Sequence, residues 1–176
     1  AKDSRTIDRK TYYQYDRAYE MIDKYQPQAV VFSDGGPGCR WVGNENGFAG
    51  ATNWSFLRAG EVYPGYPKYR ELQYGHADGN QWVAAECDVS IRPGWFYHPE
   101  EDNRVKTVEQ LTDLYYRSVG HNATLLLNFP VDRNGLIHPV DSANAVDFHK
   151  NIQKQLAHNL LSGVVAEVSE DRKSVV

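Results

Sequence analysis

Residues 29–47 read AVVFSDGGPGCRWVGNENG, and this stretch decides how the chain is expected to fold. Its apolar run, residues 29–33, predicts a short buried strand. The run ends at Asp34 and passes directly into GGPG, where glycine and proline break regular structure and form a loop. The stretch therefore predicts a carboxylate that is presented at the end of a strand, on a face built from loops.

Amphipathic helices are expected on both sides of this strand. In residues 8–28, four side chains share one helical face before a proline stops the helix: Tyr15, Ala18, Ile22 and Tyr25. A second helix begins at Thr107, which forms a capping box with Gln110, and it is expected to end at Gly120. A third covers residues 139–161, with Asp141 as its cap.

Residues 82–90 and 123–129 predict two further strands. The first, WVAAECDVS, alternates imperfectly and places Glu86 and Asp88 on one side. The second, ATLLLNF, predicts a buried strand, and the DRNG that follows it at 132–135 predicts a turn. Residues 41–80 lack sustained periodicity, so we expect long loops there, and loops of that length usually serve a function.

Strands that alternate with amphipathic helices indicate an α/β fold with parallel strands, in a barrel or an open sheet. A complete (β/α)₈ barrel takes roughly 250 residues. This chain has 176 residues, about enough for half of one. The chain is therefore a fragment of a barrel or an open α/β layer.

The composition excludes several function classes. The formal charge is −4, with 19 basic and 23 acidic residues well mixed, so no basic stripe predicts nucleic acid as a partner. No apolar run approaches the roughly 20 residues that cross a bilayer. Motifs for a metal, a nucleotide phosphate or a dinucleotide are missing, so we expect neither a cofactor nor a metal. Cys39 and Cys87 could pair, but free buried thiols are favoured.

Two carboxylates fit the requirement of a retaining glycosidase, which needs two carboxyl groups about 5 Å apart. Asp34 and Glu86 are each expected at a strand end that is followed by loop-forming residues. Asp88 shares a side with Glu86 and could be the acid or hold a sugar hydroxyl. Glu45 is a third candidate for the acid, or it could contact the leaving sugar. Among 23 acidic residues, ordinary loop and cap carboxylates are the competing explanation.

Aromatic and basic residues near these carboxylates are candidates for binding sugar. The chain has 4 Trp and 12 Tyr, more than an ordinary core of this size needs. Trp95 follows a Pro-Gly turn, and Trp41 and Trp54 lie in the long loops, so each could stack on a sugar or simply pack. Arg92 and His98 could bind hydroxyls, although a structural hydrogen bond is the alternative for both.

Three blocks carry a resemblance to a known family: VVFSDGGPGCRWVGNENG at 30–47, WVAAECDVSIRPGWFYH at 82–98 and NATLLLNFPVDRNGLIHP at 122–139. In this order they resemble the second half of family 29 glycoside hydrolases, the α-L-fucosidases, over about residues 10–160. That family has a (β/α)₈-like barrel and usually a C-terminal β-sandwich. The resemblance implies that residues 1–163 are the C-terminal part of a (β/α)₈-like (TIM-type) barrel, incomplete in this chain. Residues 164–176 would be a linker or the start of the sandwich.

The resemblance also implies a retaining α-L-fucosidase that removes terminal α-linked L-fucose from oligosaccharides or glycoprotein glycans. Asp34 would be the nucleophile and Glu86 the acid/base. The blocks RWVGNENG and E-x-D-x-S-I-R-P-G-W resemble the subfamily that prefers α-1,3/1,4 linkages. The remaining half of the catalytic domain is expected as a partner of this chain. The expected location of the protein is a periplasmic, secreted or lysosomal-type compartment, although no signal peptide is visible in the sequence. A non-catalytic carbohydrate-binding remnant or an inactive fragment of a fucosidase is the alternative.

Overall fold

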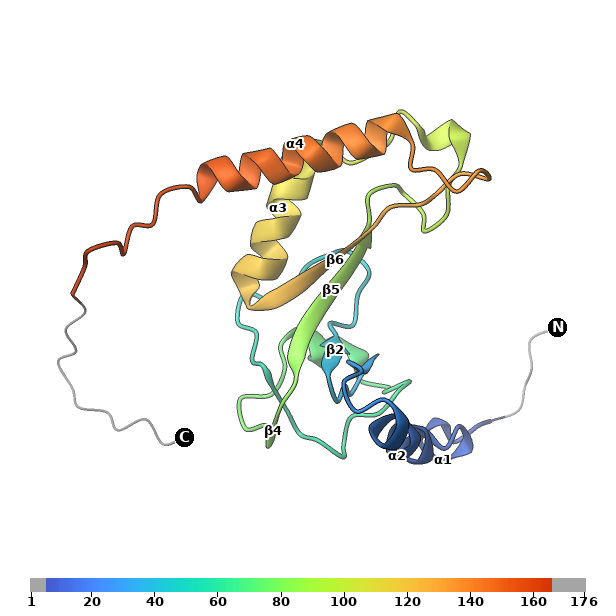
Figure 1. Cartoon of the computed structure of the whole chain (residues 1–176). Helices are drawn as coiled ribbons and strands as arrows, with labels where there is room; N and C mark the ends of the chain where they lie inside the picture. The colour runs from blue at the N-terminus through green and yellow to red at the C-terminus, as the bar shows by residue number, and fades with distance from the viewer. Residues whose placement is uncertain (1–5, 166–176) are drawn as a thin grey trace.

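The computed structural model describes residues 6–165 (Figure 1). Its α-helices are α1 (Arg9–Tyr12), α2 (Tyr15–Tyr25), α3 (Val108–Ser118) and α4 (Pro139–Gln155). Its strands are β1 (Phe32–Ser33), β2 (Cys39–Trp41), β3 (Phe56–Leu57), β4 (Gln81–Trp82), β5 (Ala84–Ser90) and β6 (Ala123–Asn128). Short 3₁₀ helices span Tyr69–Gln73, Pro99–Glu101 and Val119–His121.

Four strands form one parallel sheet in the order β1-β2-β5-β6, which confirms the predicted α/β class. The long strand β5 pairs with β2 on one side and with β6 on the other. Strands β3 and β4 make a separate antiparallel pair, and β4 leads directly into the amino end of β5. Helix α3 packs on β6, and α4 crosses α3 near the carboxyl ends of the strands (Figure 1).

The alternation along β5 separates a covered face of the sheet from an open one. Ala85, Cys87 and Val89 are buried, and Glu86 and Asp88 between them are only partly buried. On the covered face, Val89 joins an apolar cluster with residues of α3, and Ala85 and Cys87 pack beside the segment that follows β2. Glu86 and Asp88 therefore lie on the open face, as their shared side of the strand predicted.

Several local predictions are confirmed. Thr107 accepts a hydrogen bond from the backbone N–H of Gln110, and the Gln110 side chain accepts one from the N–H of Thr107, which completes the capping box of α3. Asp132 closes the predicted turn at 132–135 by accepting backbone hydrogen bonds from Asn134 and Leu136. Residues 41–80 are mostly loop, with only the end of β2, β3 and one 3₁₀ helix as regular structure.

The predicted burial of two strands is wrong for the residues that the structure describes. Within 29–33 only Phe32 and Ser33 form a strand, and Phe32 is 44% exposed. In β6, Leu126 is 49% exposed on the open face. Both strands lie at an edge of the sheet, where Phe32 and Leu126 remain exposed in the described part of the chain. Both apolar runs contain a strand, as predicted, but each strand exposes side chains on one of its two faces.

Helix boundaries differ from the prediction where side chains make other contacts. Gln14, with a φ of 52°, breaks the first helix into α1 and α2. Residues Val119–His121 continue α3 as a 3₁₀ helix, so the left-handed residue that ends it is Asn122 rather than Gly120. His138 caps α4, and Asp141 is fully buried inside its first turn, bound to Arg92.

No helix between residues 6 and 165 is both long and apolar enough to cross a membrane. The predicted linker or sandwich start at 164–176 lies outside the described residues except for its first two positions.

Arg40, on β2, organises the long loops from inside the protein. Its guanidinium is fully buried and donates to the carbonyl oxygens of Leu72, Val83 and Trp54 and to Oδ1 of Asn53, at 2.6–3.1 Å. Burial lowers the pKa of Arg40 to about 10, so it stays protonated at neutral pH. One cation thus binds three separate segments of the chain beside the sheet.

Replacing Arg40 by Met should lower the free energy of unfolding of the full-length protein by at least about 3 kcal/mol, because buried acceptors without partners each cost about 1–3 kcal/mol. Urea unfolding followed by far-UV circular dichroism measures the loss. Arg104→Met, at an exposed position, is the control and should stay within about 0.5 kcal/mol of wild type. An equally small loss for Arg40→Met would contradict this role.

Candidate active site

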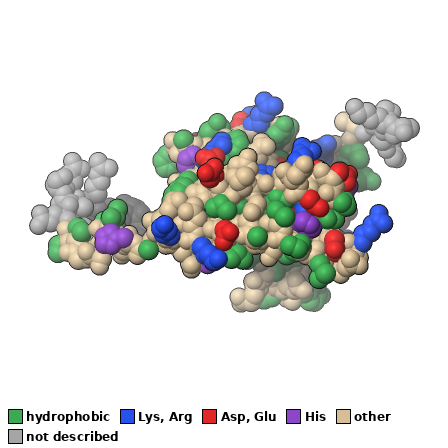
Figure 2. Space-filling view, turned by 90° about the horizontal axis from the view of Figure 1, so that it is seen from above, with side chains coloured by type: hydrophobic (Ala, Val, Ile, Leu, Met, Phe, Trp, Pro, Cys, Tyr) green, Lys and Arg blue, Asp and Glu red, His purple; other side chains and the backbone are tan. Residues whose placement is uncertain are grey.

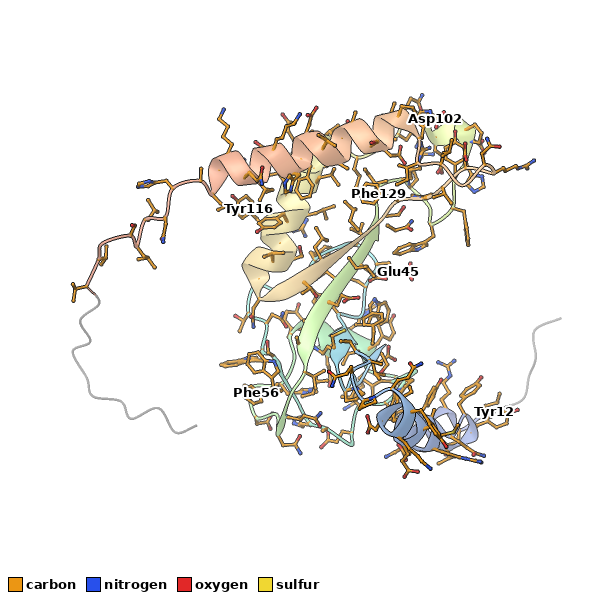
Figure 3. All side chains as sticks on the ribbon, in the orientation of Figure 1. Tyr12, Glu45, Phe56, Asp102, Tyr116 and Phe129 are labelled. Atoms are coloured by element: carbon orange, nitrogen blue, oxygen red, sulfur yellow. The ribbon has the colours of Figure 1, made fainter. Side chains whose placement is uncertain are left out.

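The parallel sheet brings the carboxyl ends of its strands to one edge, where catalytic groups of barrel enzymes lie. Asp34 follows β1, Glu45 lies in the loop after β2, and Trp95 lies in the loop after β5. Figure 3 shows Glu45 and Phe129 near this edge, well away from Phe56 of β3. Most of the residues expected at the site are therefore gathered at one edge of the sheet.

Trp41 and Asp88 meet on the open face of the sheet. The indole Nε1 of Trp41 donates to Oδ1 of Asp88 at 2.8 Å, and the ring of Tyr69 stacks on Trp41 with centroids 6.1 Å apart. Burial raises the pKa of Asp88, the Trp41 hydrogen bond opposes that rise, and the charge of Glu45 adds to it. Glu45 is thus close enough to Asp88 to disfavour its ionised form.

Glu45 and Trp95 join the loop after β2 to the loop after β5. The indole Nε1 of Trp95 donates to Oε2 of Glu45 at 3.0 Å. Both side chains are exposed, and a cleft of about 310 Å³ lies between the two loops. This contact orients a carboxylate that remains open to solvent, as an acid that must reach a substrate requires.

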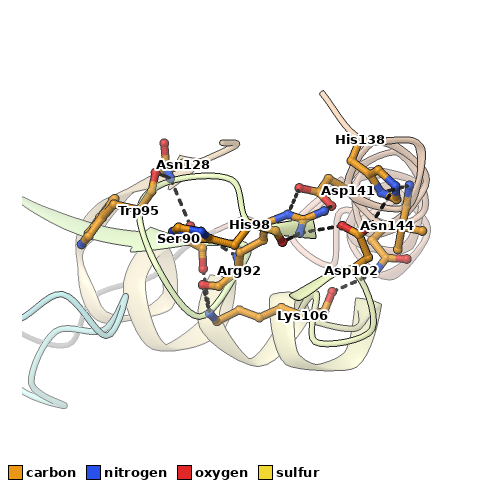
Figure 4. A network of polar contacts seen from close by, with 11 residues as sticks. Ser90, Arg92, Trp95, His98, Asp102, Lys106, Asn128, His138, Asp141 and Asn144 are labelled. Carbon is orange, nitrogen blue, oxygen red and sulfur yellow. Dashed lines mark hydrogen bonds and ion pairs between the residues drawn. The ribbon is translucent and has the colours of Figure 1, made fainter. Parts of the chain in front are cut away.

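Asn128, the last residue of β6, fixes the position of Trp95 and was not identified from the sequence. Its Nδ2 donates to the carbonyl oxygen of Trp95 and to Oγ of Ser90, each at 3.1 Å (Figure 4). The only sequence signal was a polar residue at the carboxyl end of an apolar strand. Through Asn128 of β6 and Ser90 of β5, the ends of two neighbouring strands fix the backbone at Trp95.

Asp34 has a different environment from the other carboxylates. Its Oδ2 accepts hydrogen bonds from the backbone N–H groups of Gly65, at 2.6 Å, and Tyr66, at 3.1 Å. Gly65 has a φ of 83°, a conformation that favours glycine. Asp34 thus ties the end of β1 to the loop at residues 61–66.

Glu86 lies four residues before the end of β5 and is level with Trp41 of β2. The expectation that it stands at a strand end is therefore wrong, because pairing with β6 extends β5 to Ser90. Its Oε2 accepts a contact from the thiol of Cys39 at 3.7 Å. Burial, aided by the charge of Glu86, raises the pKa of Cys39 to about 11, so the thiol stays protonated at neutral pH.

The two cysteines do not pair, which confirms the expectation of free thiols. Cys39 is level with Ala84, and Cys87 lies three positions further along β5, on the covered face. The alternation of side chains therefore points the two thiols to opposite sides of the sheet.

Arg92 serves as a structural anchor, one of the two roles that the sequence left open. Its Nε and Nη2 donate to the carboxylate of Asp141, both at 2.8 Å, and its Nη1 lies 2.9 Å from Oδ1 of Asp102 (Figure 4). The guanidinium is fully buried, so it is not available to sugar hydroxyls. It holds the loop after β5 to the first turn of α4.

Trp54 and His98 lie at opposite ends of the sheet's strands. The Trp54 carbonyl accepts from Arg40, and the neighbouring Asn53 donates to the carbonyls of His121 and Asn122, just before β6. Trp54 is therefore at the amino ends of the strands, and the expectation that it belongs to the site is not supported. His98 is exposed in the loop after β5, with Glu100 3.8 Å from its Nδ1.

Charges are interspersed on the molecule. Figure 2 shows acidic and basic side chains mixed on the face seen from above, with no block of Lys and Arg. Between residues 6 and 165, no group of three or more His, Cys, Asp or Glu could hold a metal ion.

Comparison with known proteins identifies the family. The family model for α-L-fucosidase matches residues 2–153. The chain belongs to the α-L-fucosidase family. It is 42% identical over 153 residues to α-L-fucosidase 1 of Arabidopsis thaliana, a match that covers 84% of this chain and 29% of the plant protein. These fucosidases are glycoside hydrolases.

Solved structures agree with this assignment. A glycoside hydrolase family 29 member from an unknown rumen bacterium has 46% identity and a TM-score of 0.84, covering 95% of this chain and 30% of that one. A family 29 fucosidase of Ruminococcus gnavus in complex with fucose has 29% identity and a TM-score of 0.70, covering 84% and 31%. The chain thus spans about three tenths of the length of these fucosidases.

Replacing Asp88 by Asn tests the effect of partial burial on this carboxyl of β5. Folding raises the pKa of Asp88, so its stabilising contribution is complete below the unfolded pKa and is lost as pH rises through the folded pKa. Asparagine avoids this loss and still accepts from Trp41. The stability gained by Asp88→Asn in the full-length protein should therefore grow with pH through the acid range and then level off.

Thermal unfolding at a series of pH values between 3 and 7 measures this difference. Asp23→Asn, at an exposed position of α2, is the matched control. If the difference for Asp88→Asn falls as pH rises, burial does not control this carboxyl.

Proposed function

We propose that the protein containing this chain is a retaining α-L-fucosidase that releases terminal α-linked L-fucose from oligosaccharides or glycoprotein glycans. The family match over residues 2–153 carries this proposal. The exposed pair of Glu45 and Trp95 at the carboxyl edge of the sheet, and the partly buried pair of Asp88 and Trp41 on its open face, support it. The preference for α-1,3/1,4 linkages belongs to the same proposal and rests on the resemblance of residues 40–47 and 86–95 to that subfamily.

The rest of the catalytic domain completes the sheet in this proposal. Strands β1 and β6 each have an unpaired edge in the part of the chain that the structure describes. Exposed sheet edges promote aggregation unless another element covers them. Carboxylates and apolar groups such as Leu126 share the open face. These features fit four consecutive strands of a (β/α)₈ barrel whose other strands lie elsewhere in the protein.

We infer that Glu45, rather than Glu86, is the acid/base. Glu45 lies in a loop at the carboxyl edge, is open to solvent and is oriented by Trp95. Glu86 lies inside β5 and faces the thiol of Cys39. In this reaction Glu45 donates its proton to the glycosidic oxygen as the bond to fucose breaks. It then takes a proton from the water that hydrolyses the fucosyl-enzyme.

Glu45→Gln should lower kcat/KM of the full-length enzyme for a fucosylated oligosaccharide by about 10²–10⁴-fold, the usual contribution of general acid–base catalysis. The amide oxygen can still accept from Trp95, so the loop should keep its place. Kinetics across pH 4–9 should also lose the basic limb of the profile. Glu86→Gln is the matched control, and a larger loss there than in Glu45→Gln would return the acid/base role to Glu86.

Asp34 remains the sequence's candidate for the nucleophile, but its two backbone hydrogen bonds support a different role. We infer that it anchors the loop at residues 61–66 and that another strand of the complete barrel supplies the attacking carboxylate. In the chain's described part, this anchor joins β1 to a loop that is distant in sequence. An anchor needs an oxygen that accepts hydrogen bonds, whereas a nucleophile needs the negative charge.

Asp34→Asn separates these roles, because the amide oxygen keeps an acceptor for Gly65 and Tyr66 and loses the charge. We expect the full-length variant to keep its fucosidase activity within about tenfold, since the Asn carbonyl can replace the lost acceptor at a cost near 1 kcal/mol. Asp34→Gly should lose stability, and added azide should not restore its turnover. Loss of activity in both variants with recovery as β-fucosyl azide would make Asp34 the nucleophile.

A further inference from the structure

A second, larger cleft lies at the same edge of the sheet. Residues 96–100 of the loop after β5 and residues 131–134 of the loop after β6 enclose a volume of about 640 Å³. Protein sites for small ligands usually have volumes of about 300–1,000 Å³. The cleft is thus large enough for a ligand of more than one sugar.

This cleft continues the proposed active site along one stretch of chain. Phe96, which lines it, directly follows Trp95, and Trp95 donates to Glu45. Asn128 holds the carbonyl of Trp95, and the segment that follows Asn128 forms the opposite wall. The two clefts are therefore lined by consecutive residues of one loop, Trp95 and Phe96.

Both walls of the cleft are held in place before any ligand binds. The guanidinium of Arg92, fixed by two carboxylates, lies 4.6 Å from the centre of the Tyr97 ring. On the other wall, Val131 pairs with Ile137, and backbone hydrogen bonds to Asp132 lower the pKa of that carboxyl. A pre-formed site loses less conformational entropy when a ligand binds.

The lining has the chemistry that recognises neutral sugars. Phe96 is 78% exposed and presents an aromatic ring, and Asn134, His98 and Arg133 supply groups that hydrogen-bond hydroxyls. Arg133 offsets one of the two acidic side chains, Glu100 and Asp132, so with His98 neutral the lining carries only a small negative charge and does not favour an anionic ligand.

We propose that this cleft binds the sugars to which fucose is attached, as a subsite for a neutral leaving group of one to three residues. This inference rests on the proposed fucosidase function. It assigns recognition of the leaving group to the loops after β5 and β6, separate from the residues that act on fucose.

Phe96→Ala in the full-length enzyme tests the subsite with two substrates. One is a fucosylated tetrasaccharide, and the other is α-L-fucosyl fluoride, whose leaving group is too small to occupy the cleft. The ratio of kcat/KM for the tetrasaccharide to that for the fluoride should fall about tenfold, the value of a lost aromatic contact. Leu136→Ala removes a side chain that is 64% exposed on the same hairpin but outside the lining, and its ratio should match wild type.

Calorimetric titration with N-acetyllactosamine, a disaccharide without fucose, provides a readout that does not depend on catalysis. Wild type and Leu136→Ala should bind it, and Phe96→Ala should bind at least tenfold more weakly. Equal binding by all three, or no binding to wild type, overturns the subsite. If wild type releases fucose from neither substrate, the proposed function fails, while this titration still decides the cleft.

Discussion

The pairing of β5 with both β2 and β6 is the constraint on which the rest of the structure depends. Side chains alternate along a strand, so this pairing commits Ala85, Cys87 and Val89 to the covered face. It commits Glu86 and Asp88 to the open face in the same step. A shift of one residue would bury both carboxylates and expose the apolar side chains, which would cost several kcal/mol. The register that builds the core is therefore also the register that presents the acidic groups.

Two buried arginines extend this order from the sheet to its loops. A buried guanidinium must find partners for its donors, because an unpaired charge inside a protein is strongly unfavourable. Arg40 donates to three carbonyl groups and one side-chain amide. These hydrogen bonds fix the segments around β2 in place. Arg92 does so with Asp141 and Asp102, and hydrogen bonding to Asp141 is the main cause of its raised pKa. Each arginine therefore fixes neighbouring segments of the chain relative to the sheet.

Local sequence was sufficient to predict the features that depend on neighbouring residues. The capping box at Thr107, the turn at Asp132 and the shared face of Glu86 and Asp88 all follow from spacings of two to four positions. Features that depend on distant partners could not be predicted. The local pattern predicts Asp141 as a helix cap, whereas its carboxylate binds Arg92, 49 residues away. Likewise, Glu86 looked like a strand end because the pairing that extends β5 comes from β6.

The loop after β5 connects the two functions assigned to the carboxyl edge. The Trp95 indole donates a hydrogen bond to Glu45, and Asn128 donates one to the carbonyl oxygen of Trp95. The next residue, Phe96, lines the larger cleft. A leaving group seated against Phe96 would therefore press on the same segment that orients the proposed acid. Binding energy from a remote part of a substrate raises the rate only when it improves the interactions made in the transition state. A loop that contacts both the leaving sugars and the proton donor provides a physical route for that gain, because a correct leaving group would help to hold Glu45 beside the oxygen that it protonates.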